Sequence, residues 1–192
     1  MPERCTMRFL CLFLLAILVS SPAAAQSFPF TADEFLKRFN ADLATDGIDT
    51  TRSCRQSRSD VECTFNDARF QDGLKAMKKL NLANGQFSQK KTLLITLEDK
   101  KVAEIILSGD RSDPINLFHF IASVRSVIKA IDPSVSEDAI KTTVDGLGLM
   151  RGDSNKTIGN PVNQIEDYGA IKCNNQHSRV STTVGCVFVP RS

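Results

Sequence analysis

The chain has 192 residues, of which 42% are hydrophobic, 24% charged and 7% aromatic, and this balance excludes a disordered polymer, a fibrous repeat and a coiled coil. Its 24 basic and 22 acidic side chains give a formal net charge of +2, which is too small for a protein that binds nucleic acid mainly through the phosphates. Composition therefore excludes classes of protein but selects no activity.

The first 25 residues have the pattern of a secretory signal peptide. Arg4 and Arg8 give a positively charged N-terminal region, and an unbroken run of 11 apolar or Cys residues follows. Three small residues, the last of which is Ala25, provide a cleavage site. A membrane anchor is the alternative, but a helix of 11 residues rises only about 16 Å, against a hydrocarbon core of roughly 30 Å. We predict cleavage after Ala25 and a mature protein that is periplasmic or secreted, without stable membrane insertion.

The mature chain is expected to form one domain. Loss of Glu3, Arg4 and Arg8 leaves 22 basic and 21 acidic side chains over 167 residues, so the mature protein is nearly neutral. A chain of this length buries roughly two-thirds of its unfolded surface in one core and is short for two. Residues 26–192 are therefore expected to be a single domain.

Four cysteines remain after residue 25, and an even number in an exported chain favours disulfide bonds. Cys54 and Cys63 flank one polar stretch, and Cys173 and Cys186 flank another, as expected for two hairpins with one Cys on each strand. Of the three possible pairings we predict 54 with 63 and 173 with 186. A zinc site is the alternative, but the spacings C-x8-C and C-x12-C lack close Cys pairs or nearby His ligands.

The first predicted helix begins after Thr31 and ends at Gly47. Thr31 and Glu34 form an S/T-x-x-E capping box, and Phe35 and Phe39 begin an apolar stripe with a spacing of four residues. This stripe predicts that one face of the helix is buried.

Two hairpins are predicted next from alternating polar and apolar residues. The first joins strands 48–54 and 61–66, and the second joins strands 92–98 and 102–107. The segment 67–86 between them is ambiguous, since its apolar residues have helical spacing but glycine and asparagine occur near its ends.

Two helices and two strands complete the chain. The longer helix has Asp113 as its predicted N-cap and Pro114 at its first position, and its apolar stripe is centred near Ile121 and Val124. The second helix begins at Ser136. Strands near 164–173 and 180–189 follow.

This order of elements lacks a regular βαβ alternation. It predicts an α+β fold in which about three helices cover one face of a mostly antiparallel sheet that contains the two disulfide-bonded hairpins.

The chain has two histidines, and neither has the neighbours that catalysis or metal binding requires. His119 is predicted on the solvent side of the longer helix beside Ser123 and Ser126, and His177 in a polar loop. The chain also lacks nucleophile, zinc and phosphate-binding motifs. We therefore predict no catalytic residue, no metal and no cofactor.

Clusters of basic residues are the stronger functional indication. They predict a binding surface for an anionic partner, such as an envelope polymer, a lipid headgroup or an acidic protein. The alternative is an ordinary solvated surface. The residues assigned to this surface are Arg52, Arg55, Arg58, Lys75, Lys78 and Lys79.

The sequence thus predicts an exported binding or accessory protein that is not an enzyme and recognises an anionic envelope component or a protein. The alternative is a small secreted hydrolase whose site residues come together only in the fold.

Overall fold

The computed structural model describes residues 26–65, 91–110, 114–149, 163–165, 169–177 and 182–191. The predicted signal peptide, the ambiguous segment 67–86 and the predicted N-cap Asp113 lie outside these residues.

Three helices and seven strands are described. The helices are α2 (Ala32–Thr45), α4 (Pro114–Ile131) and α5 (Glu137–Gly146). The strands are β1 (Thr51–Gln56), β2 (Asp60–Phe65), β3 (Thr92–Glu98), β4 (Lys101–Asp110), β5 (Asn163–Ile165), β6 (Gly169–His177) and β7 (Thr182–Val189).

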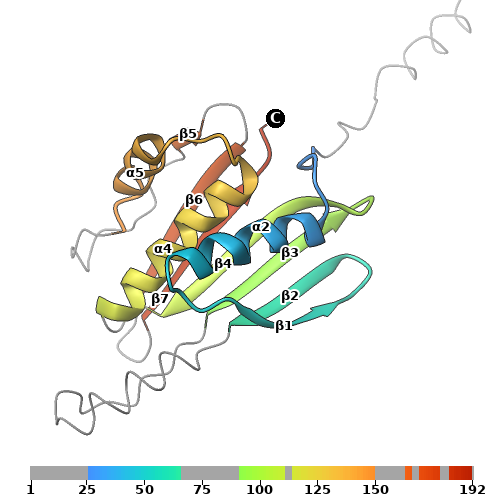
Figure 1. The fold of residues 1–192 in the computed structure, drawn as a ribbon, viewed down its shortest axis with the longest axis horizontal. Coiled ribbons are helices and arrows are strands. Elements are labelled where there is room, and N and C mark those ends of the chain that lie inside the picture. Colours follow the sequence, from blue (N-terminus) through green and yellow to red (C-terminus); the bar gives the residue numbers. More distant parts are fainter. Residues whose placement is uncertain are drawn as a thin grey trace, which may run out of the picture.

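The seven strands form one sheet in the order β1-β2-β3-β4-β7-β6-β5, and every neighbouring pair is antiparallel. Helices α2 and α4 pack against each other on one face of this sheet, and α5 contacts α4 and β5 (Figure 1). The α+β class expected from the sequence is confirmed.

Both predicted disulfides are present, between Cys54 and Cys63 and between Cys173 and Cys186. Each joins two residues that are directly opposite each other on neighbouring strands. Disulfides of this kind indicate an oxidising compartment outside the cytoplasm.

Helices α2 and α5 begin where the capping signals predict. The Glu34 amide donates to the Thr31 hydroxyl at 3.3 Å, and the Thr31 amide donates to the Glu34 carboxylate at 2.7 Å, which completes the capping box of α2. The Ser136 hydroxyl accepts from the Ala139 amide at the start of α5. Each bond satisfies a backbone donor that the first turn of a helix leaves without a partner.

A row of five phenylalanine rings packs in the core on the inner face of the sheet, with three stacked pairs followed by one edge-on pair. Neighbouring ring centroids in the row are 5.2, 6.0, 5.6 and 6.0 Å apart. The row runs from the N-terminal segment through α2 to β2, and all of its members are buried. We call these five residues the phenylalanine row. In order, they are Phe28, Phe30, Phe35, Phe39 and Phe65.

Two strand predictions need correction. The expected strand 164–173 is two strands, β5 and β6, separated by residues 166–168, and β6 continues to His177. The expected strand 48–54 begins only at Thr51, because Ile48 turns back and donates its amide to the Leu43 carbonyl at 2.9 Å. The residues joining α2 to β1 are therefore still part of the helix end.

The prediction that one side of α4 faces solvent is also wrong. Ser123 and Ser126 are fully buried, although the sequence placed them with His119 on the exposed side. The Ser126 hydroxyl donates to Asp42 on α2 at 2.7 Å, and the Ser123 hydroxyl donates to the His119 carbonyl at 2.8 Å. Because each hydroxyl has an acceptor, α2 can pack over this side of α4 at little cost.

Two phenylalanines test the assigned core. Replacing Phe39, which has no exposed surface, with Ala should lower the free energy of unfolding by about 3 to 5 kcal/mol through lost burial and a cavity. The same replacement at Phe118, which is 62% exposed, should change it by less than about 0.5 kcal/mol. Urea unfolding measures both values, and equal losses would contradict the orientation of α2 and α4.

Candidate binding surfaces and a buried lysine

Three of the predicted basic residues lie on the hairpin of β1 and β2. Arg52 and Arg55 are exposed on β1, and Arg58 is exposed in the turn, where the Ser57 amide donates to the Asp60 carbonyl at 2.8 Å. The Cys54–Cys63 bridge joins the two strands at the middle of the hairpin. The other three, Lys75, Lys78 and Lys79, lie outside the described residues.

Acidic residues are interspersed with these arginines. Arg55 is directly opposite Glu62 in the register of β1 and β2, and the Asp60 carboxylate accepts from the Ser59 hydroxyl at 2.8 Å. The hairpin therefore presents alternating charges rather than a continuous basic patch.

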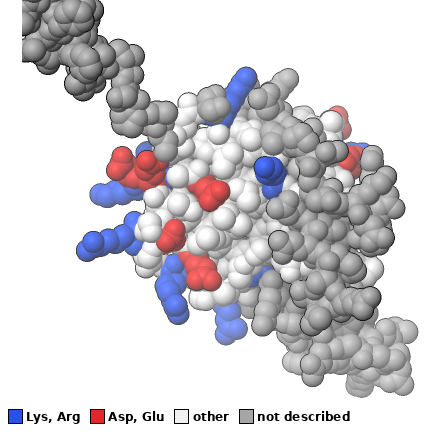
Figure 2. All heavy atoms as spheres, turned by 180° about the vertical axis from the view of Figure 1, so that it is seen from behind, with Lys and Arg blue, Asp and Glu red and all other residues white. Residues whose placement is uncertain are grey.

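The hairpin borders the face of the sheet opposite the helices, which we call the outer face. Half-buried Leu94, Ile106 and Val187 lie next to one another there on β3, β4 and β7, with Glu62 beyond one end of this apolar row and Lys172 beyond the other. Figure 2 views the molecule from this side, where acidic and basic side chains lie at the margin of the uncharged surface and also among it. The outer face thus combines a small apolar centre with a charged border.

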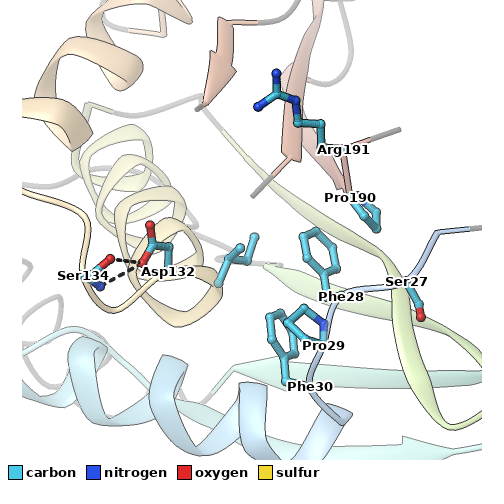
Figure 3. Close-up of a pocket in the computed structure, with 9 residues that line it drawn as sticks. Ser27, Phe28, Pro29, Phe30, Asp132, Ser134, Pro190 and Arg191 are labelled. Carbon is cyan, nitrogen blue, oxygen red and sulfur yellow. Dashed lines mark hydrogen bonds between the residues drawn. The ribbon is translucent and has the colours of Figure 1, made fainter. Parts of the chain in front are cut away.

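A separate pocket of about 460 Å³ lies where the N-terminal segment, the end of α4 and the residues after β7 meet (Figure 3). Its apolar lining comes from Phe28, Phe30, Ile131 and Pro190, among others. The Phe28 amide donates to the Val102 carbonyl at 2.7 Å, which attaches the N-terminal segment to the sheet. The wall formed by this segment is therefore part of the fold.

The pocket also has charged residues from two different segments. Asp132 follows the last residue of α4, and Arg191 follows β7. The Asp132 carboxylate accepts from the Ser134 amide at 2.9 Å and from the Ser134 hydroxyl at 2.6 Å, both through Oδ1 (Figure 3).

Lys91 is a buried cation at the other end of the phenylalanine row. It is 4% exposed, its ammonium donates to the Ser123 hydroxyl at 3.3 Å, and its nitrogen lies 4.6 Å from the centre of the Phe65 ring. Burial lowers the pKa of Lys91 to about 8, although the negative charge of Asp49 partly opposes this shift. A hydroxyl, an aromatic face and a carboxylate thus compensate for the lost hydration of the ammonium.

The two histidines belong to different elements. His119 is half-buried on α4, and burial, together with the positive charge of Lys91, lowers its pKa. His177 is the last residue of β6, opposite Thr182, and not in a loop as predicted. Among the described residues no group of three His, Cys, Asp or Glu is placed to hold a metal ion.

The sequence analysis assigned no role to Lys91 or Asp132. The alternation of β3 is a signal for Lys91, since it has the same parity as Leu93 and Ile95, which are buried in the core. Within the described part of the chain no helix is long and apolar enough to cross a membrane.

The buried state of Lys91 can be tested by the pH dependence of stability. Between pH values of about 8 and 10.5 the unfolded chain retains a proton on Lys91 that the folded chain has released, so the free energy of unfolding rises with pH. Across this range the wild type should gain roughly 3 kcal/mol relative to Lys91→Met.

The measurement is urea unfolding at a series of pH values. Lys37→Met, which changes an exposed lysine on α2, is the matched control and should run parallel to the wild type. If the Lys91→Met curve also runs parallel to the wild type, Lys91 does not change its proton affinity on folding.

No family model, no curated protein and no solved structure matches this chain. The function therefore has to be argued from the residues of the chain itself.

Proposed function

We propose that the protein is exported and acts by binding an acidic protein partner through the hairpin of β1 and β2 and the adjoining outer face. The observation that carries the proposal is the exposure of Arg52, Arg55 and Arg58 on one disulfide-bridged hairpin. Their display on a cross-linked hairpin limits the conformational entropy lost when a partner binds.

The charge pattern favours a folded protein over an anionic polymer. Glu62 and Asp60 alternate with the arginines, so a continuous polyanion would meet repulsion as well as attraction. A protein surface can place carboxylates against the arginines and avoid the acidic positions. The apolar row of Leu94, Ile106 and Val187 offers such a partner a dehydrated centre next to the charged border.

The leader pattern and the disulfides both support an exported protein. Four paired cysteines fit an oxidising compartment, and an N-terminal sequence with the features of a cleaved signal gives a route to it. The partner is accordingly expected in the same compartment.

Charge reversal on the hairpin tests the binding role. Changing Arg52, Arg55 and Arg58 to Glu should abolish capture of the partner from an envelope extract, because attraction becomes repulsion. Added salt should weaken the wild-type complex, since exposed charges are screened over about 8 to 10 Å. Titration of the captured partner at two ionic strengths measures both effects.

Reversal of Lys37 and Lys141, which are exposed on α2 and α5, is the control and should leave capture unchanged. Capture that is insensitive to salt and to the hairpin reversal would exclude the arginine surface as the binding site.

A hydrolase is the second candidate, because the fold brings Lys91 within 3.3 Å of Ser123. A neutral lysine can accept a proton from a serine nucleophile, and a lowered pKa makes the neutral form accessible. Ser123, however, has no exposed surface and donates its hydrogen to a backbone carbonyl, so a substrate has no direct approach to it. Binding is therefore the preferred function.

A fluorophosphonate probe distinguishes the two candidates. Intact mass should show no adduct on the wild type after prolonged incubation. An adduct that disappears in both Ser123→Ala and Lys91→Met would make the protein a serine hydrolase.

A further inference from the structure

The pocket at the end of α4 has a negative charge in an unusual electrostatic position. The C-terminus of a helix carries a partial negative charge, so a carboxylate immediately after it is unfavourable and basic residues are preferred there. Asp132 is such a carboxylate, and its amide donates to the Ile128 carbonyl at 2.9 Å, which continues the helical hydrogen bonding. The Arg38 guanidinium donates to the Ala130 carbonyl at 3.3 Å and compensates part of the helix-end charge, so the Asp132 carboxylate is the negative group of this pocket.

The basic residue in the last turn of α4 pairs with carboxylates other than Asp132. Lys129, the basic residue of the last turn, forms ion pairs with Asp42 on α2 and Glu137 on α5. Its charge is thus shared between two other carboxylates on the side of α4 that faces those helices.

Part of the Asp132 carboxylate has a local structural role. Ser134 binds Oδ1 through its amide and its hydroxyl, and this turn helps to end the helix. Neither bond engages Oδ2, for which the described residues provide no partner. This oxygen can accept a hydrogen bond from a ligand without disturbing the turn.

The rest of the lining fits an apolar body. Phe28 and Ile131 line the pocket beside Asp132, and Pro190 lines it from the end of β7 (Figure 3). A pocket of about 460 Å³ is in the range that holds small molecules rather than protein segments. Asp132 lines the pocket from the α4 side, and Arg191 lines it from the β7 side.

We propose that this pocket binds a small organic amine, with its ammonium on Asp132 and its apolar body against Phe28, Ile131 and Pro190. An ammonium supplies both the opposite charge and the hydrogen-bond donor that the Asp132 carboxylate favours. This ligand site is separate from the arginine hairpin and does not depend on the proposed partner.

Phenethylamine is a suitable probe, since it combines a primary ammonium with a flat apolar ring. Titration followed by amide NMR shifts should give a dissociation constant on the order of 1 mM, as expected for so small a ligand. The largest shifts should fall on residues 28, 131, 132 and 134. The uncharged analogue 2-phenylethanol and the anion 3-phenylpropionate should bind at least about tenfold more weakly.

Substitutions at Asp132 test the assigned contact. Asp132→Asn should weaken phenethylamine binding by about tenfold or more, whereas Asp132→Glu, which keeps the charge, should retain most of it. Asp138→Asn, at an exposed position in the first turn of α5, is the matched control and should leave binding unchanged. Thermal unfolding of each variant verifies that the fold is intact.

Three results would overturn the proposal: equal binding of the alcohol and the amine, shifts located away from the pocket, or full binding by Asp132→Asn. The hairpin triple reversal should still bind phenethylamine. This separates failure of the amine site from failure of the proposed partner surface.

Discussion

The contact on which the other features depend is the phenylalanine row on the inner face of the sheet. It joins three segments that are separated in the sequence, namely the residues after position 25, helix α2 and strand β2. Aromatic rings bury large areas, and stacked pairs add about 0.5 to 1.5 kcal/mol beyond that area. The row therefore determines where α2 sits, and α2 in turn covers one side of α4.

Polar or charged groups lie next to the buried core at both ends of this row. At one end Phe28 and Phe30 form a wall of the amine pocket, and at the other Phe65 offers its ring to the Lys91 ammonium. Arg38 lies over the Phe30 ring at 5.7 Å and donates to the Ala130 carbonyl, which links the row to the last turn of α4. The same packing thus positions two chemically different sites.

Local signals account for the parts of the fold that the sequence predicted. The capping box of Thr31 and Glu34, the alternation in β3 and the two Cys hairpins each depend on residues close together in the chain. Burial of Ser126 depends instead on Asp42, which is 84 positions away in the sequence. The periodicity of α4 alone therefore gives no sign of this partner. Hydrophobic periodicity marks the apolar side of a helix but does not show that the polar side is exposed.

The sites were harder to predict for the same reason. The pocket combines Phe28, Asp132 and Pro190, which come from three distant segments, so no spacing in the sequence relates them. Lys91 could have been placed from the alternation of β3, since a residue two positions before Leu93 points to the same side of the sheet. A lysine is more often found in solvent, so its residue type alone does not predict this burial.

The position of β1 in the sheet limits how the proposed partner can bind. Among the described strands β1 lies at one edge, and edge strands can pair with a strand from another molecule unless something prevents it. A register irregularity between Thr51 and Ser53 and the exposed Arg52 and Arg55 make this edge unsuitable for regular pairing. Because backbone pairing along β1 is disfavoured, the partner binding that we propose has to use side chains there, and the arginines that protect the edge are also the groups proposed to select an acidic partner.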